Sequence, residues 1–466
     1  MTERQSIHGQ WSSRLVFILA ATGSAVGLGN IWKFPYITGE NGGGAFVVIY
    51  LLCIAVVGIP VMMAEVMLGR RGRQSPINTM TMLSEEEQAS KAWSLVGWSG
   101  VVAGLLILSY YSVIAGWALA YVIRAGGGAF NGMDAGGIEG LFNHLVGDPE
   151  RLLAWHTLFM LMTMFVVAKG VKAGLEKAVT YLMPALFVLL IVLVGYAVNT
   201  GHFKEGFDFL FTPDFGKLLY SCRVVEGLEQ CELSGSPILT ALGHAFFTLS
   251  LGMGAIMVYG SYMPKKASIS GSVMLITFLD TLVALVAGMA IFPIVFANGL
   301  EPAAGPGLIF QTLPIAFGAM PGGQFFGTLF FLLLVFAAWS SAISLIEPAV
   351  AWLVENREMT RVRASAWLGG TTWVLGLGTI FSFNLGSDLK IWDKTFFDLL
   401  DYLTANILLP LGGLLIAVFA GWVMKQASSR DEFAMRDWIY RLWWVLIRYI
   451  SPIAVVVVFL HAIGIV

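Results

Sequence analysis

The sequence predicts an all-α integral membrane protein with eleven transmembrane helices, built as a 5+5 inverted repeat with discontinuous helices 1 and 6. Composition is the first observation: 57% of the 466 residues are hydrophobic, 12% are charged, and the mean hydropathy is +0.79. A soluble domain carries about twice that fraction of charge. The second observation is the recurrence of apolar runs of roughly 20 residues, the length of a bilayer-spanning helix. The third is an interruption in two of those runs.

The apolar runs give the helices in chain order. Five runs fall within residues 14–199, five within 238–424, and the eleventh occupies 438–465. We therefore expect two blocks of five helices and one additional helix within a single membrane domain, residues 1–466. The predicted spans are 14–37, 43–68, 93–125, 153–170, 178–199, 238–262, 270–298, 323–354, 364–384, 396–424 and 438–465.

Basic residues predict the orientation, because cytoplasmic connections of membrane proteins are enriched in lysine and arginine. With a cytoplasmic N-terminus, the even-numbered connections are cytoplasmic and basic, whereas the opposite connections are acidic. The C-terminus then lies outside. Simple loops favour a bacterial inner (plasma) membrane, and no basic tract indicates nucleic-acid binding. The basic residues are Arg70, Arg71, Arg73, Lys91, Lys169, Lys172, Lys177, Lys265, Lys266, Arg357, Arg361, Arg363, Lys425, Arg430, Arg436 and Arg441.

The first span is interrupted by small and polar residues, 23–30, with the sequence GSAVGLGN. Glycines weaken a helix at a depth where unpaired backbone groups cost several kcal/mol. A break of this kind is tolerated where protein buries it or where it lines a cavity. Close packing of helices through small residues is the alternative explanation.

The sixth span has a matching interruption, because glycines and hydroxyl residues recur within 245–254, AFFTLSLGMG. Since the first and sixth spans open two blocks of five, corresponding helices run in opposite directions, as in an inverted repeat. Half-helices that meet at the midplane offer free N–H groups to a carboxylate and free carbonyl groups to a cation. A zwitterionic amino acid together with sodium fits this chemistry.

These segments resemble a known family. Residues 23–35, the run ENGGGAF at 40–46, and 246–254 resemble the first, second and sixth helices of the neurotransmitter:sodium symporter family. The resemblance extends from Trp11 to about the eleventh span. It implies a transporter domain that couples amino acid import to sodium by alternating access. No Ser-His-Asp set, thiolate cluster or phosphate loop indicates an enzyme, and no organic cofactor is implied.

The resemblance places the substrate between the two breaks. The substrate carboxylate would meet sodium, the amides near Gly27 and Gly29 and the Tyr111 hydroxyl, and its ammonium would meet carbonyls at the breaks. Amine carriers of the family have Asp at the position of Gly27, so glycine indicates an amino acid rather than an amine. An uncharged lining indicates apolar aliphatic or aromatic cargo. The implied substrate residues are Ala25, Gly27, Gly29, Ile107, Tyr111, Phe247, Thr248, Ser250, Met253, Ser341 and Leu345.

Two sodium sites follow from the same resemblance. The first comprises Ala25, Asn30, Thr248 and Asp280, with Asp280 standing where the family usually has Asn. The second comprises Gly23, Val26, Ala337, Ser340 and Ser341. Chloride-dependent relatives have Ser where this chain has Ala284, so we expect chloride independence, with Asp280 supplying the negative charge. Alternatively, Asp280 is protonated and serves only in packing, because desolvation disfavours a charged carboxylate. The Ser pair, taken alone, reads as hydroxyls bonded to their own helix.

Gates are expected on both sides of the substrate. Lys33 and Asp401 would pair outside a lid formed by Tyr111 and Phe247. On the inner side, Trp11 matches the gate tryptophan of the family, and His8 stands in place of the usual Arg, with Glu355 as its acidic partner. Arg4 is the alternative cation of this gate. Because His is only partly charged at neutral pH, this inner gate is expected to be weaker or pH-sensitive. Glu347 is expected to face Tyr262, and Glu65 to brace the break in helix 1.

Two further features concern single segments. Gly174 and Pro184 flank the cytoplasmic start of the fifth span, where unwinding would let the second sodium leave inward; a simple proline kink is the alternative. Cys222 and Cys231 share an outer loop, and their spacing permits a disulfide, against two free thiols.

The sequence therefore indicates a sodium-coupled symporter of apolar L-amino acids, with the lipid bilayer and a small-molecule substrate as its partners. A proton-coupled carrier of the same fold is one alternative, with Asp280 as the proton acceptor. An amino acid sensor that binds without transport is the other. The sequence does not indicate an oligomeric state.

Overall fold

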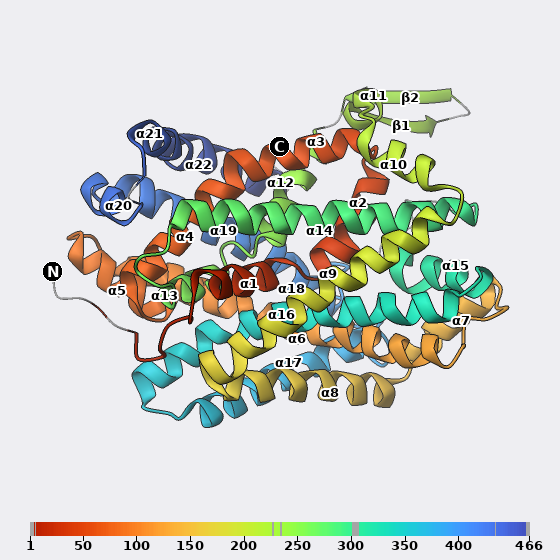
Figure 1. Cartoon of the computed structure of the whole chain (residues 1–466), viewed down its shortest axis with the longest axis horizontal. Coiled ribbons are helices and arrows are strands. Elements are labelled where there is room, and N and C mark those ends of the chain that lie inside the picture. Colours follow the sequence, from red (N-terminus) through yellow and green to blue (C-terminus); the bar gives the residue numbers. More distant parts are fainter. Residues whose placement is uncertain are drawn as a thin grey trace.

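The computed structural model of the chain describes residues 4, 6–225, 228–233, 235–300, 307–433 and 435–462. These residues form a bundle of long helices, with one short hairpin at its edge (Figure 1). The fold class predicted from composition is therefore confirmed, and the strands β1 (Tyr220–Val225) and β2 (Leu228–Leu233) are its small non-helical addition.

The first predicted span is broken in the structure. Helix α1 (Arg14–Ala25) begins where the Ser13 hydroxyl accepts a hydrogen bond from the Val16 N–H, which satisfies one of the free donors of its first turn. It ends at Val26, whose backbone is extended. The π-helical turn η1 (Gly29–Lys33) and α2 (Phe34–Glu40) then continue the span at an angle of 52° to α1.

The rest of the first five-helix block consists of long helices and their connections. Pro at the start of α4, α5 and α8 is compatible with helix, because the first turn has no partner for its N–H. The elements are α3 (Gly44–Cys53), η2 (Ile54–Gly58), α4 (Ile59–Gly72), α5 (Pro76–Glu86), η3 (Lys91–Trp93), α6 (Ser94–Gly126), α7 (Ala135–Val146), α8 (Pro149–Ala168), η4 (Val171–Glu176) and α9 (Lys177–Val198).

The second block opens with a second broken span, α12 (Ser236–Thr248) and α13 (Ala255–Ser261). Two short helices, α10 (Phe203–Phe211) and α11 (Phe215–Leu219), precede the hairpin that leads to it. The later elements are α14 (Ile269–Ala297), η5 (Leu308–Thr312), α15 (Leu313–Ala319), α16 (Gly323–Arg357), α17 (Arg361–Ser382), α18 (Phe396–Tyr402), η6 (Leu403–Leu408), α19 (Leu409–Val418), η7 (Phe419–Val423), α20 (Gln426–Phe433), α21 (Asp437–Val445), η8 (Leu446–Ile450) and α22 (Ser451–Ala462).

Among the described residues, eight helices are long and apolar enough to cross a bilayer, and the bent pair α1–α2 makes nine. The two remaining predicted spans correspond to the broken pair α12–α13 and to α17. A multi-pass membrane protein is thus confirmed, and the count of eleven spans stays a prediction.

The broken helices lie in the interior of the bundle. Helix α1 packs against α9, α14 and α16, and α13 packs closely against α4. Figure 1 shows α5, α13 and α20 at one end, and α7, α10, α15 and the hairpin at the opposite end. Residues 23–30 are all buried, and they include three glycines and an asparagine. The interior of the bundle at this point therefore contains unwound backbone as well as large side chains.

Candidate functional site

The break in helix 1 is stabilised by its own side chains. The Asn30 Oδ1 accepts a hydrogen bond from the Gly27 N–H at 3.1 Å, which replaces a bond that a continuous helix would provide. The Leu28 N–H donates to the Tyr111 hydroxyl of α6 at 3.2 Å. Two of the freed amides are therefore satisfied, as backbone groups at membrane depth require.

The break in helix 6 depends on three residues with left-handed backbone, Ser250 (φ 54°), Gly252 (φ 80°) and Gly254 (φ 74°). At Gly252 a Cβ would lie 2.4 Å from the Leu409 carbonyl oxygen, so only glycine fits. The Gly252 N–H donates to Glu65 Oε1 at 2.7 Å. The expectation that Glu65 braces helix 1 is therefore wrong: α4 packs against α13, which brings this carboxylate to the break in helix 6.

The two breaks are joined to each other. The Ser250 hydroxyl donates to the Ser24 carbonyl at 2.9 Å, and the Ser24 hydroxyl donates to the Ser344 hydroxyl of α16 at 2.8 Å. Sequence reasoning missed Ser24, although it is the hydroxyl residue directly before the unwound segment.

Asp280 lies where both breaks meet α14. The Asn30 Nδ2 donates to Asp280 Oδ1 at 2.8 Å, and the Thr248 hydroxyl lies 3.2 and 3.1 Å from the two carboxylate oxygens. All three side chains are buried. The structure therefore brings together the three side chains of the predicted first sodium site, and Ala25 lies in the adjoining cavity.

Ser341 of α16 faces the end of α1. Its hydroxyl lies 3.4 Å from the Gly23 carbonyl oxygen, and 3.2 Å from those of Ser24, Val26 and Ala337. One hydroxyl proton can satisfy only one of these acceptors at a time. A cluster with more acceptors than donors is the arrangement that a cation stabilises.

Ser340 occupies the neighbouring position. Its hydroxyl donates to the Ala337 carbonyl at 3.0 Å, on its own helix. At Gly23 a Cβ would lie 3.3 Å from the Ser340 Cβ, so glycine allows α1 to approach α16 closely. The structure thus brings the predicted second sodium set together: the carbonyl groups of Gly23, Val26 and Ala337 surround the Ser341 hydroxyl. Ser340 is the adjacent residue on α16.

A cavity with about 350 Å³ of empty space lies between the breaks. No charged side chain is among its lining residues. It includes the predicted substrate residues except Thr248, which faces Asp280 instead, and adds Ser24 and Leu28. The lining residues are Ser24, Ala25, Gly27, Leu28, Gly29, Ile107, Tyr111, Phe247, Ser250, Met253, Ser341 and Leu345.

Two glycines keep this cavity open. At Gly27 a Cβ would lie 2.5 Å from the Ser341 Oγ and 2.9 Å from the Tyr111 hydroxyl. At Gly29 it would lie 3.2 Å from the Phe247 ring. Any larger residue at Gly27 would therefore displace a hydroxyl that borders the cavity.

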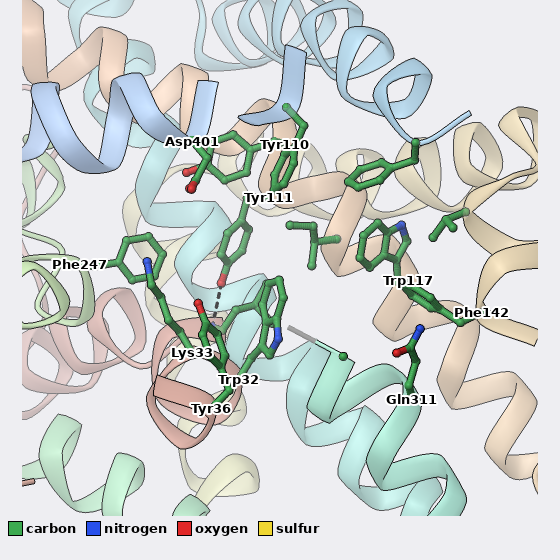
Figure 2. A pocket seen from close by; sticks show the side chains of 16 residues that line it. Trp32, Lys33, Tyr36, Tyr110, Tyr111, Trp117, Phe142, Phe247, Gln311 and Asp401 are labelled. Atoms are coloured by element: carbon green, nitrogen blue, oxygen red, sulfur yellow. Dashed lines mark hydrogen bonds between the residues drawn. The ribbon is translucent and has the colours of Figure 1, made fainter. Parts of the chain in front are cut away.

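A larger cavity, with about 1170 Å³ of empty space, lies beyond Tyr111, Phe247 and Leu28, which line both spaces and separate them (Figure 2). Lys33 and Asp401 line this vestibule on the side of Phe247, opposite Trp117, Phe142 and Gln311. The Lys33 ammonium lies 4.7 Å from the centre of the Phe247 ring. Pairing of Lys33 with Asp401 stays a prediction, and the aromatic wall of Trp32, Trp117 and Phe142 was not expected from sequence.

The end of the site at which the inner gate is predicted is closed by the residues before α1. The Trp11 indole N–H donates to the Tyr259 carbonyl at 3.1 Å, and the Trp11 side chain is buried. The His8 Nε2 lies 3.0 Å from Glu355 Oε1. Glu355 also accepts hydrogen bonds from the Ser75 N–H at 2.8 Å and the Asn78 amide at 2.8 Å, which fix its position.

A second carboxylate lies close to this inner end. Glu347 accepts a hydrogen bond from the Tyr262 hydroxyl at 2.8 Å and forms an ion pair with Arg361 at the start of α17. Sequence reasoning named Glu347 and Tyr262 but missed Arg361, which it counted only as a basic loop residue. A buried carboxylate normally has a cationic partner, and that rule could have directed attention to Arg361.

Gly174 and Pro184 lie on either side of the start of α9. Gly174 belongs to the π-helical turn η4, and a Cβ there would lie 2.0 Å from the Val166 carbonyl oxygen of α8. Pro184 lies inside α9, which is wound from Lys177 to Val198. The structure therefore has the proline within a helix, and unwinding during sodium release stays a prediction.

Cys222 of β1 and Cys231 of β2 are partners in the backbone register of the hairpin. Their side chains lie outside the described residues, so the predicted disulfide stays a prediction.

Comparisons with known proteins cover almost the whole chain. The model of the Sodium:neurotransmitter symporter family matches residues 8–127 and 144–465. The chain is 38% identical to the "uncharacterized sodium-dependent transporter YhdH" of Bacillus subtilis, over 100% of this chain and 99% of that protein. It is 24% identical to the "sodium-dependent nutrient amino acid transporter 1" of Drosophila grimshawi, over 97% of this chain and 76% of that protein. The crystal structure of MhsT in complex with L-phenylalanine has a TM-score of 0.87 and 43% identity, covering 97% of this chain and 99% of MhsT.

Proposed function

The chain belongs to the sodium:neurotransmitter symporter family, a family of transporters and not of enzymes, and we propose that it imports apolar L-amino acids together with sodium by alternating access. The observation that carries this proposal is the uncharged cavity between two broken helices, which is lined both by the unwound segment from Ala25 to Gly29 and by the apolar side chains of Ile107, Met253 and Leu345. Such a cavity can hold a zwitterion at its polar side and an apolar side chain in the remainder.

The carboxylate of the substrate is assigned to the side of Gly27. A glycine there leaves space beside the Tyr111 and Ser341 hydroxyls, and the amides of the unwound segment carry the positive end of a helix dipole. The ammonium group is assigned to the carbonyls at the ends of α1 and α12, with the Ser250 hydroxyl. The phenylalanine bound in the structure of MhsT supports an amino acid as cargo.

Apolar selectivity is assigned to the lining of the side-chain end. Ile107, Phe247, Met253 and Leu345 offer no partner to a charged or strongly polar side chain, and burying such a group without a partner is costly. Met253 is a flexible thioether that adapts to several shapes, so we expect both aliphatic and aromatic amino acids to be accepted.

Sodium is co-transported cargo in this proposal, at two sites. The first uses Ala25, Asn30, Thr248 and Asp280, completed by the substrate carboxylate, so sodium and substrate would bind together. The second uses Gly23, Val26, Ala337, Ser340 and Ser341, whose oxygens outnumber their hydroxyl protons. Sodium prefers oxygen ligands, and both groups consist of carbonyl, hydroxyl, amide and carboxylate oxygens. An inward sodium gradient then drives accumulation.

Chloride independence is part of the proposal. Asp280 is buried beside the first sodium site and can supply the negative charge that chloride would otherwise supply. Ala284, one turn further along α14, has no hydroxyl to offer an anion.

Alternating access requires that the two ends of the cavity open in turn. We assign the outer barrier to Tyr111 and Phe247 with Lys33 and Asp401, and the inner barrier to Trp11, His8 and Glu355 with Tyr262 and Glu347. The N-terminus is assigned to the cytoplasm and the C-terminus to the outside, on the distribution of basic residues. Gly174 and Pro184 are assigned to an inward path for the second sodium.

The test is uptake from a mixture of twenty amino acids into proteoliposomes, with and without an inward sodium gradient. We expect sodium-dependent accumulation of apolar amino acids, unchanged when gluconate replaces chloride. Uptake driven by an acidic exterior without sodium would establish the proton-coupled carrier instead. Sodium-dependent binding of an amino acid without accumulation would establish the sensor.

A further inference from the structure

The connection between α17 and α18, residues 384–395, has an unusual surface, and we call it the finger. It carries the three most exposed large apolar side chains of the described part of the chain: Trp392 at 85%, Leu389 at 78% and Leu385 at 76%. Ile391 adds a fourth at 59%. We call these four exposed side chains within eight residues the patch, and such a concentration of exposed apolar groups is typical of an interaction surface.

The backbone of the finger presents this patch at some cost. Ile391 and Lys394 exchange two backbone hydrogen bonds, of 3.0 and 3.1 Å, around a two-residue turn. Trp392 and Asp393 form that turn with φ of 53° and 60°, a left-handed conformation that a bulky residue rarely adopts. Glycine or asparagine would satisfy this turn with less strain. A Trp held there, with its indole exposed, points to a role for the indole outside the protein.

Helix α17, which precedes the finger, also carries exposed apolar side chains. Trp367, Val374 and Phe381 are exposed at 70%, 57% and 43%. They are seven residues apart, about two helical turns, so they lie along one face of the helix. Leu385 follows three residues after the end of α17, so exposed apolar side chains occur both on the helix and in the finger.

The finger has no net charge, so its charges favour neither an acidic nor a basic partner. Asp388 and Asp393 balance Lys390 and Lys394. A Trp with neighbouring aliphatic residues and flanking lysines is the composition that settles at the boundary between lipid headgroups and acyl chains. We propose that Leu385, Leu389, Ile391 and Trp392 insert into the headgroup boundary of the lipid leaflet at this end of the molecule.

Insertion would act on the vestibule, because the base of the finger belongs to the vestibule wall. Phe383 and Phe397 flank the finger, line the vestibule, and lie 5.3 Å apart between ring centres. The Phe397 N–H donates to the Ser382 hydroxyl at 3.0 Å, and the Asn384 amide donates to the Val146 carbonyl of α7 at 3.0 Å. The finger thus anchors one wall of the outer vestibule to the membrane surface.

The test places a fluorescent label on the finger in proteoliposomes. Cys53, Cys222 and Cys231 are first replaced, and the environment-sensitive fluorophore NBD is attached to Trp392→Cys or, with Trp392 kept, to Leu389→Cys. Lys204→Cys, whose native side chain is 88% exposed in an outer connection, is the water control. Val374→Cys on the exposed face of α17 is the lipid control.

We expect phosphatidylcholine labelled with a nitroxide at carbon 5 to quench both finger labels about as strongly as the Val374 label, and aqueous iodide to quench them about twofold less than the Lys204 label. A carbon-12 nitroxide should quench them less than the carbon-5 nitroxide. Strong iodide quenching without nitroxide quenching would overturn the proposal, because the finger would then be in water. Protection from both quenchers, lost when one copy is enclosed per nanodisc, would overturn it in favour of a contact between copies of this chain.

Discussion

At the scale of single residues, the site depends on glycines, which have no side chain, as much as on polar side chains. Gly27 and Gly29 leave the space in which a substrate would lie, and Gly252 allows α19 to approach the break between α12 and α13. The polar residues around them satisfy backbone groups that the breaks set free, as Asn30 does for Gly27 and Glu65 for Gly252. Single substitutions at these positions therefore test the proposed chemistry directly.

Gly27→Ala should abolish most transport. The added methyl group would lie 2.5 Å from the Ser341 Oγ, so Ser341 or the backbone must move. Overpacking of about 1–3 kcal/mol corresponds to a loss of about fivefold to a hundredfold in sodium-dependent uptake. Gly243→Ala in α12 is the matched control, because no atom lies within 4 Å of a Cβ there. Equal uptake by the two variants would contradict the assignment of Gly27 to the substrate site.

Asp280→Asn should lower the affinity for sodium while keeping the shape of the side chain. Loss of the negative charge removes a charged oxygen ligand, so the sodium concentration for half-maximal uptake should rise about tenfold or more. Uptake measured over a range of sodium concentrations gives this value. Asp388→Asn, in the exposed connection after α17, makes the same chemical change away from the site and should have no effect. An unchanged sodium requirement in the Asp280 variant would refute its role as a ligand.

At the scale of elements, the discontinuous helices are stabilised by neighbours that lie far away in the sequence. The break in helix 6 is held by Glu65 of α4 and approached by α19, and the break in helix 1 by Tyr111 of α6 and Ser341 of α16. Each break therefore depends on the packing of other helices. Sequence alone located both breaks but assigned Glu65 to the wrong one.

Glu65→Ala should destabilise the break in helix 6. The Gly252 N–H would lose its acceptor in a buried site, which costs about 1–3 kcal/mol. Glu65→Gln keeps an oxygen in place and should retain most of the stability. Thermal unfolding of both variants in the same detergent compares them. A Glu65→Ala variant as stable as the wild type would show that the break does not need this acceptor.

Pro184→Ala should slow transport and leave the fold intact. Alanine can donate the helical hydrogen bond that proline lacks, so α9 would unwind less easily. The rate of sodium-dependent uptake should fall, while thermal stability stays equal or rises. Pro149→Ala is the control, since Pro149 begins α8, where no such bond is missing. Faster uptake by the Pro184 variant would speak against an unwinding step.

At the scale of the whole molecule, the described residues form one bundle whose two ends are closed in different ways. Buried Trp11 and the His8–Glu355 pair close one end, whereas at the other end Tyr111, Phe247 and Leu28 separate the cavity from a wide vestibule. This asymmetry fits a transporter whose cavity is closed on both sides, with a wide vestibule on one of them. The direction of transport then depends on how the bundle lies in the membrane.

Reporter fusions test that orientation. Alkaline phosphatase fused after residue 466 should be active, and green fluorescent protein fused there should be dark, because the C-terminus is expected outside. The same reporters fused after residue 430, in the basic connection before the last span, should give the opposite result. Fluorescence from the fusion after residue 466 would reverse the assigned topology or change the number of spans.

The sequence by itself determined the membrane class, the family and the position of both breaks. Apolar runs, glycines and charged residues act on the segment in which they occur, so their effects can be predicted from the sequence. The site residues Asn30, Thr248, Asp280 and Ser341 were also named from motifs, and the structure brings them together around the breaks. Only the tertiary structure decided which break Glu65 braces, that Arg361 pairs with Glu347, and that aromatic residues from distant helices build the vestibule. These contacts join segments whose relative depth and rotation are set by packing, and packing of whole helices leaves no local signature in the sequence.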